Sequence, residues 1–181
     1  KLIKTRDKIK RTGSIKYLVI KTKLGIEQHK LEQQVIGRNI LAYIEGTDKK
    51  DEVLIISAHY DHIGMRGKDV FNGADDNASG TTTVTQIAKA MQYAKSIGKG
   101  PRRSVLCLLV TGEEKGLLGS MYYVNNPVFP LSSTIADINI DMVGRIDDKY
   151  KPNGNYVYVI GSDRLSSKLH EYNESINAQY S

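Results

Sequence analysis

Two uninterrupted apolar runs constrain the fold of this 181-residue chain more than any other feature. They read EVLIISA at residues 52–58 and SVLCLLVTG at residues 104–112. A strand with one face in solvent alternates apolar and polar residues, so a continuous run is typical of a strand that is buried on both faces. Helices must then cover both sides of the sheet, which predicts an α/β fold.

Helix and strand patterns alternate along the rest of the chain, which favours parallel neighbouring strands. Ordinary hydrophobic and charged contents of 40% and 25% fit a globular protein. We therefore expect a mixed, mainly parallel central sheet flanked by helices. The further predicted elements are helices over residues 78–95, 117–127 and 164–178, and strands over residues 134–144 and 156–162.

The N-terminal part is strongly basic. Residues 1–50 hold 13 of the 26 Lys and Arg but only 5 of the 20 acidic residues. Residues 1–14 predict the end of a basic helix stopped by Gly13, and successive strands are expected from there to Gly46. We place a boundary near residue 37, with a basic flank over 1–36 and the core over 37–181. The flank has no aromatic interleaving or nucleic-acid motif, so we interpret its charge as a solvated surface rather than a nucleic-acid site.

Other compositional features exclude some classes of protein. No apolar stretch approaches the roughly 20 residues of a transmembrane helix. The single cysteine, Cys107, excludes an internal disulfide and a multi-cysteine zinc site, and its apolar surroundings favour a buried hydrophobe over a nucleophile. The first residue is Lys1 rather than Met, and we expect a chain that is cut at both ends.

Polar residues follow each predicted interior strand. His59, Asp61 and His62 follow the first, the Glu113–Glu114 pair follows the second, and Asp141 lies at the end of the third. In open α/β sheets, ligands bind in the crevice beyond the carboxyl ends of the strands. We therefore expect these side chains to gather at one edge of the sheet.

The loop GADDNASG at residues 73–80 can reach the same crevice. One imidazole and several carboxylates suit zinc best, and manganese or cobalt less well. Without a cation the carboxylates would repel one another. Of Asp75 and Asp76, one is expected to be a metal ligand and the other to cap the following helix. Each motif alone has an ordinary interpretation, as a helix cap or as a pair of solvated acidic residues. Their occurrence together, each at the end of a predicted strand, indicates a metal site.

Four motifs in this order resemble a known family. SAHYDHIG, NGADDNASG, TGEEKGLLGS and INIDMVGR are similar to those of the co-catalytic dizinc exopeptidases, which include bacterial leucyl aminopeptidases and glutamate carboxypeptidase. The similarity spans roughly residues 37–145 and fades beyond. It implies the phosphorylase/hydrolase-like fold of zinc exopeptidases, incomplete here at the C-terminus.

The resemblance also implies roles for individual residues. His59 resembles the imidazole ligand of one zinc ion, and Asp61 the carboxylate that orients its ring. Asp76 matches the ligand that bridges two zinc ions. Glu114 matches a ligand of the other zinc ion, Asp141 a second ligand of the ion held by His59, and Glu113 the general base. Asp75 matches a variable position outside the metal set.

One departure concerns the second zinc ion. The family completes that site with a histidine near the end of the domain, in a setting that none of this chain's four histidines shares. We expect His62 to line the loop rather than to bind metal, and His170 to lie on an exposed helix. The remaining histidine outside the motifs is His29.

The resemblance implies a zinc-dependent exopeptidase that acts on peptides, most simply an aminopeptidase, and export from the cytosol. Two alternatives share the fold: a glutaminyl-cyclase-like acyltransferase with one zinc ion, and a catalytically silent binding domain. The intact Glu113 disfavours the silent form, and the retention of His59 beside Glu113–Glu114 favours two metal ions. Side-chain specificity and oligomeric state do not follow from these motifs.

Overall fold

A computed structural model describes residues 2–14, 23, 25–29, 34–151 and 154–180. The chain forms two units, Lys1–Val35 and Ile36–Ser181. The first contains helix α1 (Leu2–Thr12), so the predicted basic helix that ends at Gly13 is confirmed. Gly13 has a positive φ of 63°. Among the described residues between 14 and 39 there is no strand, so the prediction of successive strands is wrong there; its parts at 15–22, 24 and 30–33 lie outside the described residues.

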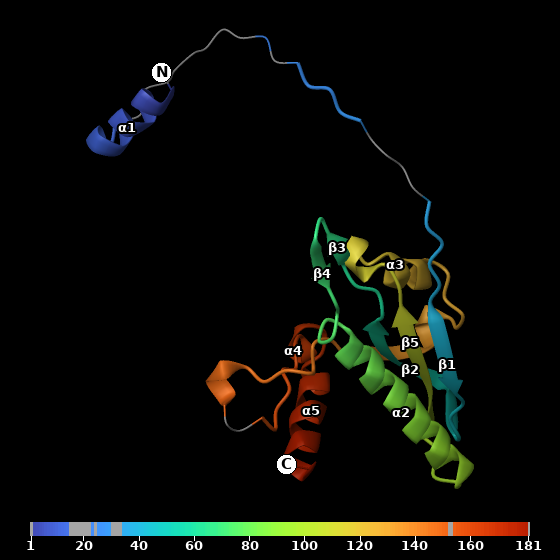
Figure 1. The fold of residues 1–181 in the computed structure, drawn as a ribbon. Helices are drawn as coiled ribbons and strands as arrows, with labels where there is room; N and C mark the ends of the chain where they lie inside the picture. Colours follow the sequence, from blue (N-terminus) through green and yellow to red (C-terminus); the bar gives the residue numbers. More distant parts are fainter. Residues whose placement is uncertain (1, 15–22, 24, 30–33, 152–153, 181) are drawn as a thin grey trace. The chain divides into compact units, whose positions relative to one another are not determined.

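The second unit is built on a four-stranded sheet with the order β1-β5-β2-β6 (Figure 1). Its strands are β1 (Ile40–Ile44), β2 (Lys49–His59), β5 (Arg103–Val110) and β6 (Thr134–Asn139). Strand β2 runs parallel to both β5 and β6, whereas β1 is antiparallel to β5. The prediction of a mixed, mainly parallel sheet is confirmed. Strand β6, expected in the interior, forms an edge of the described sheet and is mostly exposed.

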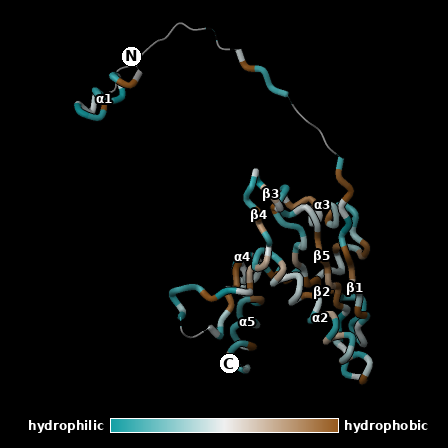
Figure 2. Tube along the Cα trace, in the orientation of Figure 1, coloured by the Kyte–Doolittle hydropathy of each residue, from teal (hydrophilic) through white to brown (hydrophobic). Residues whose placement is uncertain are grey.

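The two apolar runs are buried on both faces because helices cover both sides of the sheet. Helix α2 (Ala78–Ser96) packs on one face and α3 (Leu118–Asn125) on the other. Figure 2 shows apolar residues along the central strands. Cys107 is a buried core residue on the α2 side, as predicted, and burial raises the pKa of its thiol. Residues of the two cores are Ile44, Ile56, Ala58, Val84, Val105 and Cys107 on the α2 side, and Val53, Ile55, Leu106, Leu108, Val110 and Tyr123 on the α3 side.

Two segments differ from the sequence prediction. The glycine-rich loop after β2 contains a short hairpin of β3 (Gly64–Arg66) and β4 (Asp69–Phe71). The strand predicted over 156–162 is wrong: residues 154–161 are irregular and mostly exposed. A strand needs a hydrogen-bonding neighbour, and β-propensity alone does not supply one.

Helical segments complete the second unit. The polar helix predicted over 164–178 is confirmed, divided at Ser166 into α4 (Ser162–Leu165) and α5 (Ser167–Tyr180). Short 3₁₀ turns are η1 (Glu113–Lys115), η2 (Leu131–Ser133) and η3 (Asp148–Tyr150). Among the helices of the described residues, none has the length and apolar character needed to cross a membrane.

Candidate metal centre

The predicted site residues gather at the carboxyl ends of β2, β5 and β6. His59 is the last residue of β2 and pairs in register with Val110, the last residue of β5. Asn139, the last residue of β6, pairs with Ser57 two positions before His59. The three strands therefore end at nearly the same level, and the loops that follow them meet there.

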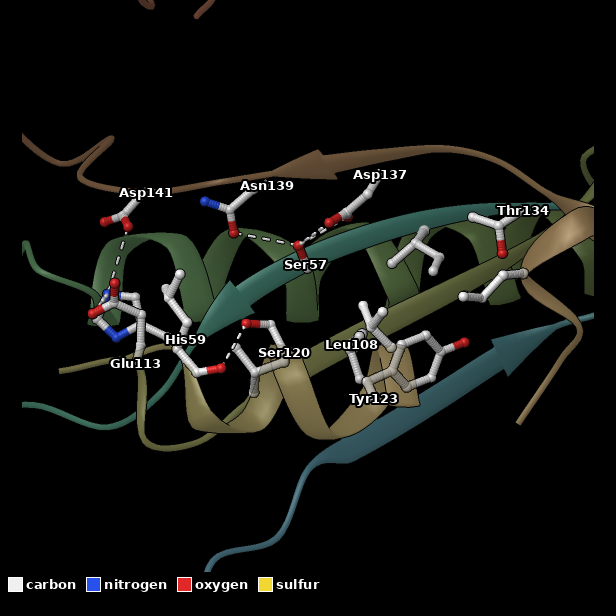
Figure 3. A pocket seen from close by; sticks show the side chains of 15 residues that line it. Ser57, His59, Leu108, Glu113, Ser120, Tyr123, Thr134, Asp137, Asn139 and Asp141 are labelled. Carbon is white, nitrogen blue, oxygen red and sulfur yellow. Dashed lines mark hydrogen bonds and ion pairs between the residues drawn. The ribbon is translucent and has the colours of Figure 1, made fainter. Parts of the chain in front are cut away.

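His59, Asp76 and Asp141 form the first cluster. His59 is buried, and its Nε2 lies 3.0 Å from Asp76 Oδ1 and 3.5 Å from Asp141 Oδ2. Figure 3 shows the side chains of His59 and Asp141 turned toward each other, with Glu113 beside them. Two N or O ligands that bind one tetrahedral zinc ion at about 2 Å lie about 3.3 Å apart. The observed distances match this spacing, so the cluster can hold one metal ion.

The loop that carries Asp76 is fixed by its neighbours. Asn77, rather than an aspartate, caps α2: its Oδ1 accepts a hydrogen bond from the Gly80 N–H at 2.9 Å. Asp75 is also buried, and its Oδ1 accepts from the Gly144 N–H at 2.9 Å. The expectation that an aspartate caps the helix was wrong, because Asn77 is the residue directly before α2 and the Asp75 carboxylate binds the loop after β6.

Asp61 holds the loop that follows β5. Its Oδ1 accepts a hydrogen bond from the Glu113 N–H at 3.0 Å, and its Oδ2 accepts from the Glu114 N–H at 3.3 Å. The His59 ring is nearer to the backbone carbonyl of Asp61, at 3.0 Å from Nδ1, than to its carboxylate, at 3.8 Å. Asp61 thus positions His59 mainly through its main chain, and its carboxylate positions the two glutamates.

The adjacent glutamates point to different surroundings. Glu113 Oε2 lies 4.0 Å from His59 Nε2, and its side chain is about one-third exposed. Glu114 is more buried and its Oε1 lies 3.1 Å from Nδ1 of His62. Glu114, His62 and Asp76 form a second cluster that could hold a metal ion. Sequence reasoning placed His62 along the loop and missed this contact; its only signal was the position of His62 three residues after His59.

The electrostatics of the first cluster favour a cation. Partial removal from solvent raises the pKa of Asp141, and the nearby Asp76 raises it further, while His59 opposes the shift. A bound cation would reverse this balance by stabilising the charged carboxylates. The mixture of imidazole nitrogen and carboxylate oxygen is the ligand set that zinc binds in proteins. The residues present therefore fit a zinc ion.

A groove of about 350 Å³ extends from this centre along β2 and β6 (Figure 3). Its end at the metal centre carries His59, Glu113 and Asp141, and its walls are mainly apolar side chains. On the floor, Ser57 Oγ donates to the Asp137 carboxylate at 2.9 Å. The apolar lining residues are Ile55, Leu108, Val110, Leu117, Tyr123, Val124 and Leu131.

Known proteins with similar sequences include proteins named as a leucine aminopeptidase, a zinc metalloprotease and a vacuolar membrane protease. The chain is 31% identical over 122 residues to a probable leucine aminopeptidase of Arthroderma otae, covering 66% of this chain and 34% of that protein. It is 34% identical over 112 residues to a probable zinc metalloprotease of Pyrenophora tritici-repentis; the match covers 59% of this chain and 22% of that protein. It is 30% identical over 118 residues to a vacuolar membrane protease of Verticillium alfalfae; the match covers 56% of this chain and 11% of that protein. The chain thus spans about a third or less of the length of these relatives.

A solved structure supports the same relationship. The zinc aminopeptidase of Bacillus subtilis superposes with a TM-score of 0.60 at 26% identity, covering 78% of this chain and 32% of that one. The family model described as Peptidase family M28 matches residues 39–181, which extends beyond residue 145, where the sequence motifs end. The fold, the order of the strand-end residues and this match agree, and the chain belongs to Peptidase family M28.

Proposed function

We propose that this chain is the catalytic core of a zinc-dependent exopeptidase, with the core at residues 37–181, and that it removes N-terminal residues from peptides. The observation that carries the proposal is the position of Glu113. Its carboxylate lies beside the cluster of His59, Asp76 and Asp141 but belongs to neither group of candidate ligands. A carboxylate left free next to a metal centre is what a general base requires.

The chain's own residues then have distinct roles. His59, Asp76 and Asp141 would hold one zinc ion, and Asp76 and Glu114 would contribute ligands to a second. Bound zinc supplies a Lewis acid that lowers the pKa of water and polarises the scissile carbonyl. Glu113 accepts the proton of the attacking water and delivers it to the leaving amine. Asp61 keeps Glu113 in place by accepting the hydrogen bond of its main-chain N–H.

The direction of cleavage rests on the relatives. Two proteins similar to this chain are aminopeptidases by name, one from Arthroderma otae and one from Bacillus subtilis. The apolar groove beside Glu113 offers walls for a substrate side chain. Because other relatives are vacuolar membrane proteases, we also place the protein outside the cytosol.

Hydrolysis of chromogenic aminoacyl substrates tests this function. The purified chain, loaded with zinc, is assayed on a panel of aminoacyl anilides, on the same compounds with a blocked amine, and on C-terminal peptide substrates. We expect release from the free-amine compounds only, and loss of activity after chelation with recovery on zinc addition. Cyclisation of N-terminal glutamine without residue release, or cleavage restricted to the C-terminal substrates, would contradict an aminopeptidase.

A further inference from the structure

We propose that Asp137 selects substrates with a basic N-terminal residue, because its carboxylate lies in the groove beside the metal centre, where it can pair with a lysine or arginine side chain. The proposal deepens the proposed function and rests on it. It gives the groove one occupant, which is the side chain of the residue that is removed from the peptide.

The groove runs along one face of the sheet, from the metal centre toward Asp137. Successive side chains of a strand point to opposite faces, so Ser57 and His59 share one face of β2, and Asp137 and Asn139 share one face of β6. All four residues line the groove. Figure 3 shows Asp137 and Asn139 in one row along β6, with His59 and Glu113 at the end of the groove. A side chain that leaves the metal centre along this face therefore meets Asp137.

Ser57 relates the position of Asp137 to that of His59. Ser57 Oγ lies 2.9 and 3.1 Å from the two carboxylate oxygens of Asp137 and donates its hydrogen bond to them. Ser57 precedes His59 by two residues on β2, which corresponds to about 7 Å along the strand. The Asp137 carboxylate thus lies about the length of one long side chain from the metal centre. Lysine carries its ammonium group at the end of a four-carbon stem, and the guanidinium group of arginine also ends a long side chain.

The Asp137 carboxylate has a neutral partner and lacks a positive one. Its hydrogen-bond donor is the Ser57 hydroxyl, and it forms no ion pair with any of the described residues. Partial removal from solvent raises the pKa of Asp137, while the hydrogen bond from Ser57 opposes the shift. The residue is still exposed on the edge strand, so a ligand can reach it. A cation bound beside this carboxylate would stabilise its charged form.

The walls of the groove suit the apolar part of a basic side chain. Away from the metal centre, Asp137 is the one charged residue among the described residues that line the groove. Leu108 and Val124 are among the apolar residues of the walls. Lysine and arginine pack their methylene groups on apolar surfaces and keep the charged end in a polar environment. A hydrogen bond in which both groups are charged is also stronger than one between neutral groups.

Two buried hydroxyl groups lie in the same groove. Tyr123 is 5% exposed, and within the described part of the chain neither its hydroxyl nor Thr134 Oγ has a hydrogen-bond partner. Burial raises the pKa of Tyr123, and the negative charge of Asp137 raises it further. Hydroxyl oxygens accept hydrogen bonds, and ammonium and guanidinium groups carry only donors. A basic head group therefore matches the acceptors in this part of the groove, whereas an apolar one leaves them and Asp137 unpaired.

Substrate pairs that differ only in charge test the proposal. The zinc-loaded chain is assayed on the anilides of lysine, arginine and norleucine, since norleucine has the four-carbon stem of lysine without the ammonium group. We expect kcat/KM of the wild-type protein to be higher for lysine and arginine than for norleucine by about 10–100-fold, a usual effect of a hydrogen bond between charged groups.

Replacement of Asp137 by asparagine should remove this preference. The amide keeps the shape of the carboxylate and an oxygen that can accept from Ser57, so the charge is the main change. We expect the lysine-to-norleucine ratio of kcat/KM to fall by about 10–100-fold. This ratio does not depend on the fraction of protein that is folded, because both substrates are measured on the same preparation. Asp51→Asn, which removes an exposed carboxylate outside the groove, is the control and should leave the ratio unchanged.

Binding of the free amino acids separates this proposal from the proposed function. The affinities of lysine and norleucine, the expected products, are measured by calorimetry on the zinc-loaded wild-type protein and on Asp137→Asn. Lysine binding that depends on Asp137, in a protein that hydrolyses none of the anilides, would support the basic site and reject the exopeptidase. Hydrolysis with equal or higher kcat/KM for norleucine, or a lysine-to-norleucine ratio that is the same in Asp137→Asn and wild-type protein, overturns the proposal and leaves the exopeptidase in place.

Discussion

The side-chain amide of Asn77 donates a hydrogen bond to the backbone carbonyl of Ile140 at 3.0 Å. Asn77 directly follows the candidate ligand Asp76, and Ile140 directly precedes the candidate ligand Asp141. One hydrogen bond therefore ties together two loops that belong to different strands and each carry a ligand. The distance between Asp76 and Asp141 depends on this bond as well as on the sheet.

Replacement of Asn77 by alanine should destabilise the protein. The change removes the cap of α2, worth about 1 kcal/mol, and leaves the Ile140 carbonyl without its partner, worth about 1–3 kcal/mol. We expect the free energy of unfolding, measured by urea denaturation, to fall by about 2–4 kcal/mol. Asn125→Ala on the exposed end of α3 is the control and should change it by far less. Equal effects of the two substitutions would mean that the Asn77 bonds contribute little.

Replacement of Glu113 by glutamine should abolish catalysis without removing metal. The amide keeps the shape of the carboxylate but accepts no proton, and general-base catalysis contributes about 10²–10⁴-fold to a rate. We expect kcat on an aminoacyl anilide to fall by that factor, with zinc content unchanged. Glu171→Gln on α5 serves as the control. A variant that retains its rate would show that another group takes the proton.

Replacement of Asp61 by asparagine should weaken metal binding indirectly. The side-chain NH₂ group would face one of the two N–H donors of Glu113 and Glu114, where a carboxylate oxygen now accepts. Loss of partners that orient ligands costs about 10–100-fold in metal affinity or activity. Competition with a chromophoric chelator measures the affinity, and exposed Asp69→Asn is the control. Unchanged affinity together with an unchanged rate would leave Asp61 without a role in the centre.

The pair of Asp48 and Arg102 predicts a pH dependence of stability. Hydrogen bonds from the Arg102 guanidinium, at 3.0 Å from Nε to Oδ1, lower the pKa of Asp48 from 3.8 to about 2. A carboxyl whose pKa is lower in the folded state stabilises that state above its unfolded pKa. The contribution is lost as the pH falls from about 4 to about 2. The pair is exposed, so the effect is small.

Thermal denaturation of wild-type protein and Asp48→Asn checks this prediction. The variant should melt slightly below the wild type near neutral pH, and the two midpoints should converge near pH 2. Asp51→Asn, on strand β2 just after Asp48, controls for loss of one negative charge. A difference in midpoint that persists unchanged down to pH 2 would contradict the assignment to this pair.

Local patterns predicted much of the fold. The continuous runs at 52–58 and 104–112 form β2 and β5, and the helical spacing after Ala78 forms α2. These predictions succeed because the spacing of apolar residues along the chain encodes whether a strand is buried on both faces and which side of a helix is buried. The strand predicted at 156–162 is wrong because the same local pattern carries no information about whether a neighbouring strand is available.

For the candidate site too, the sequence predicted one part and the tertiary structure decided the rest. The acids and imidazole after successive strands predicted a zinc centre, and the family resemblance implied His59, Asp76, Glu114 and Asp141 as its ligands. Which atoms face one another was not encoded locally. In the structure, Asn77 caps the helix. The Asp61 carboxylate accepts hydrogen bonds from the main-chain N–H groups of Glu113 and Glu114, and the His62 side chain contacts that of Glu114.

The sequence by itself determined that the segments of β2 and β5 are buried and which polar residues follow them, because spacing along the chain sets the face that each side chain occupies. Only the tertiary structure decided which of those polar residues meet. Strand order and register bring residues up to 82 positions apart, such as Ser57 and Asn139, into contact. A contact of about 3 Å between side chains depends on loop conformation and packing, which no local pattern specifies.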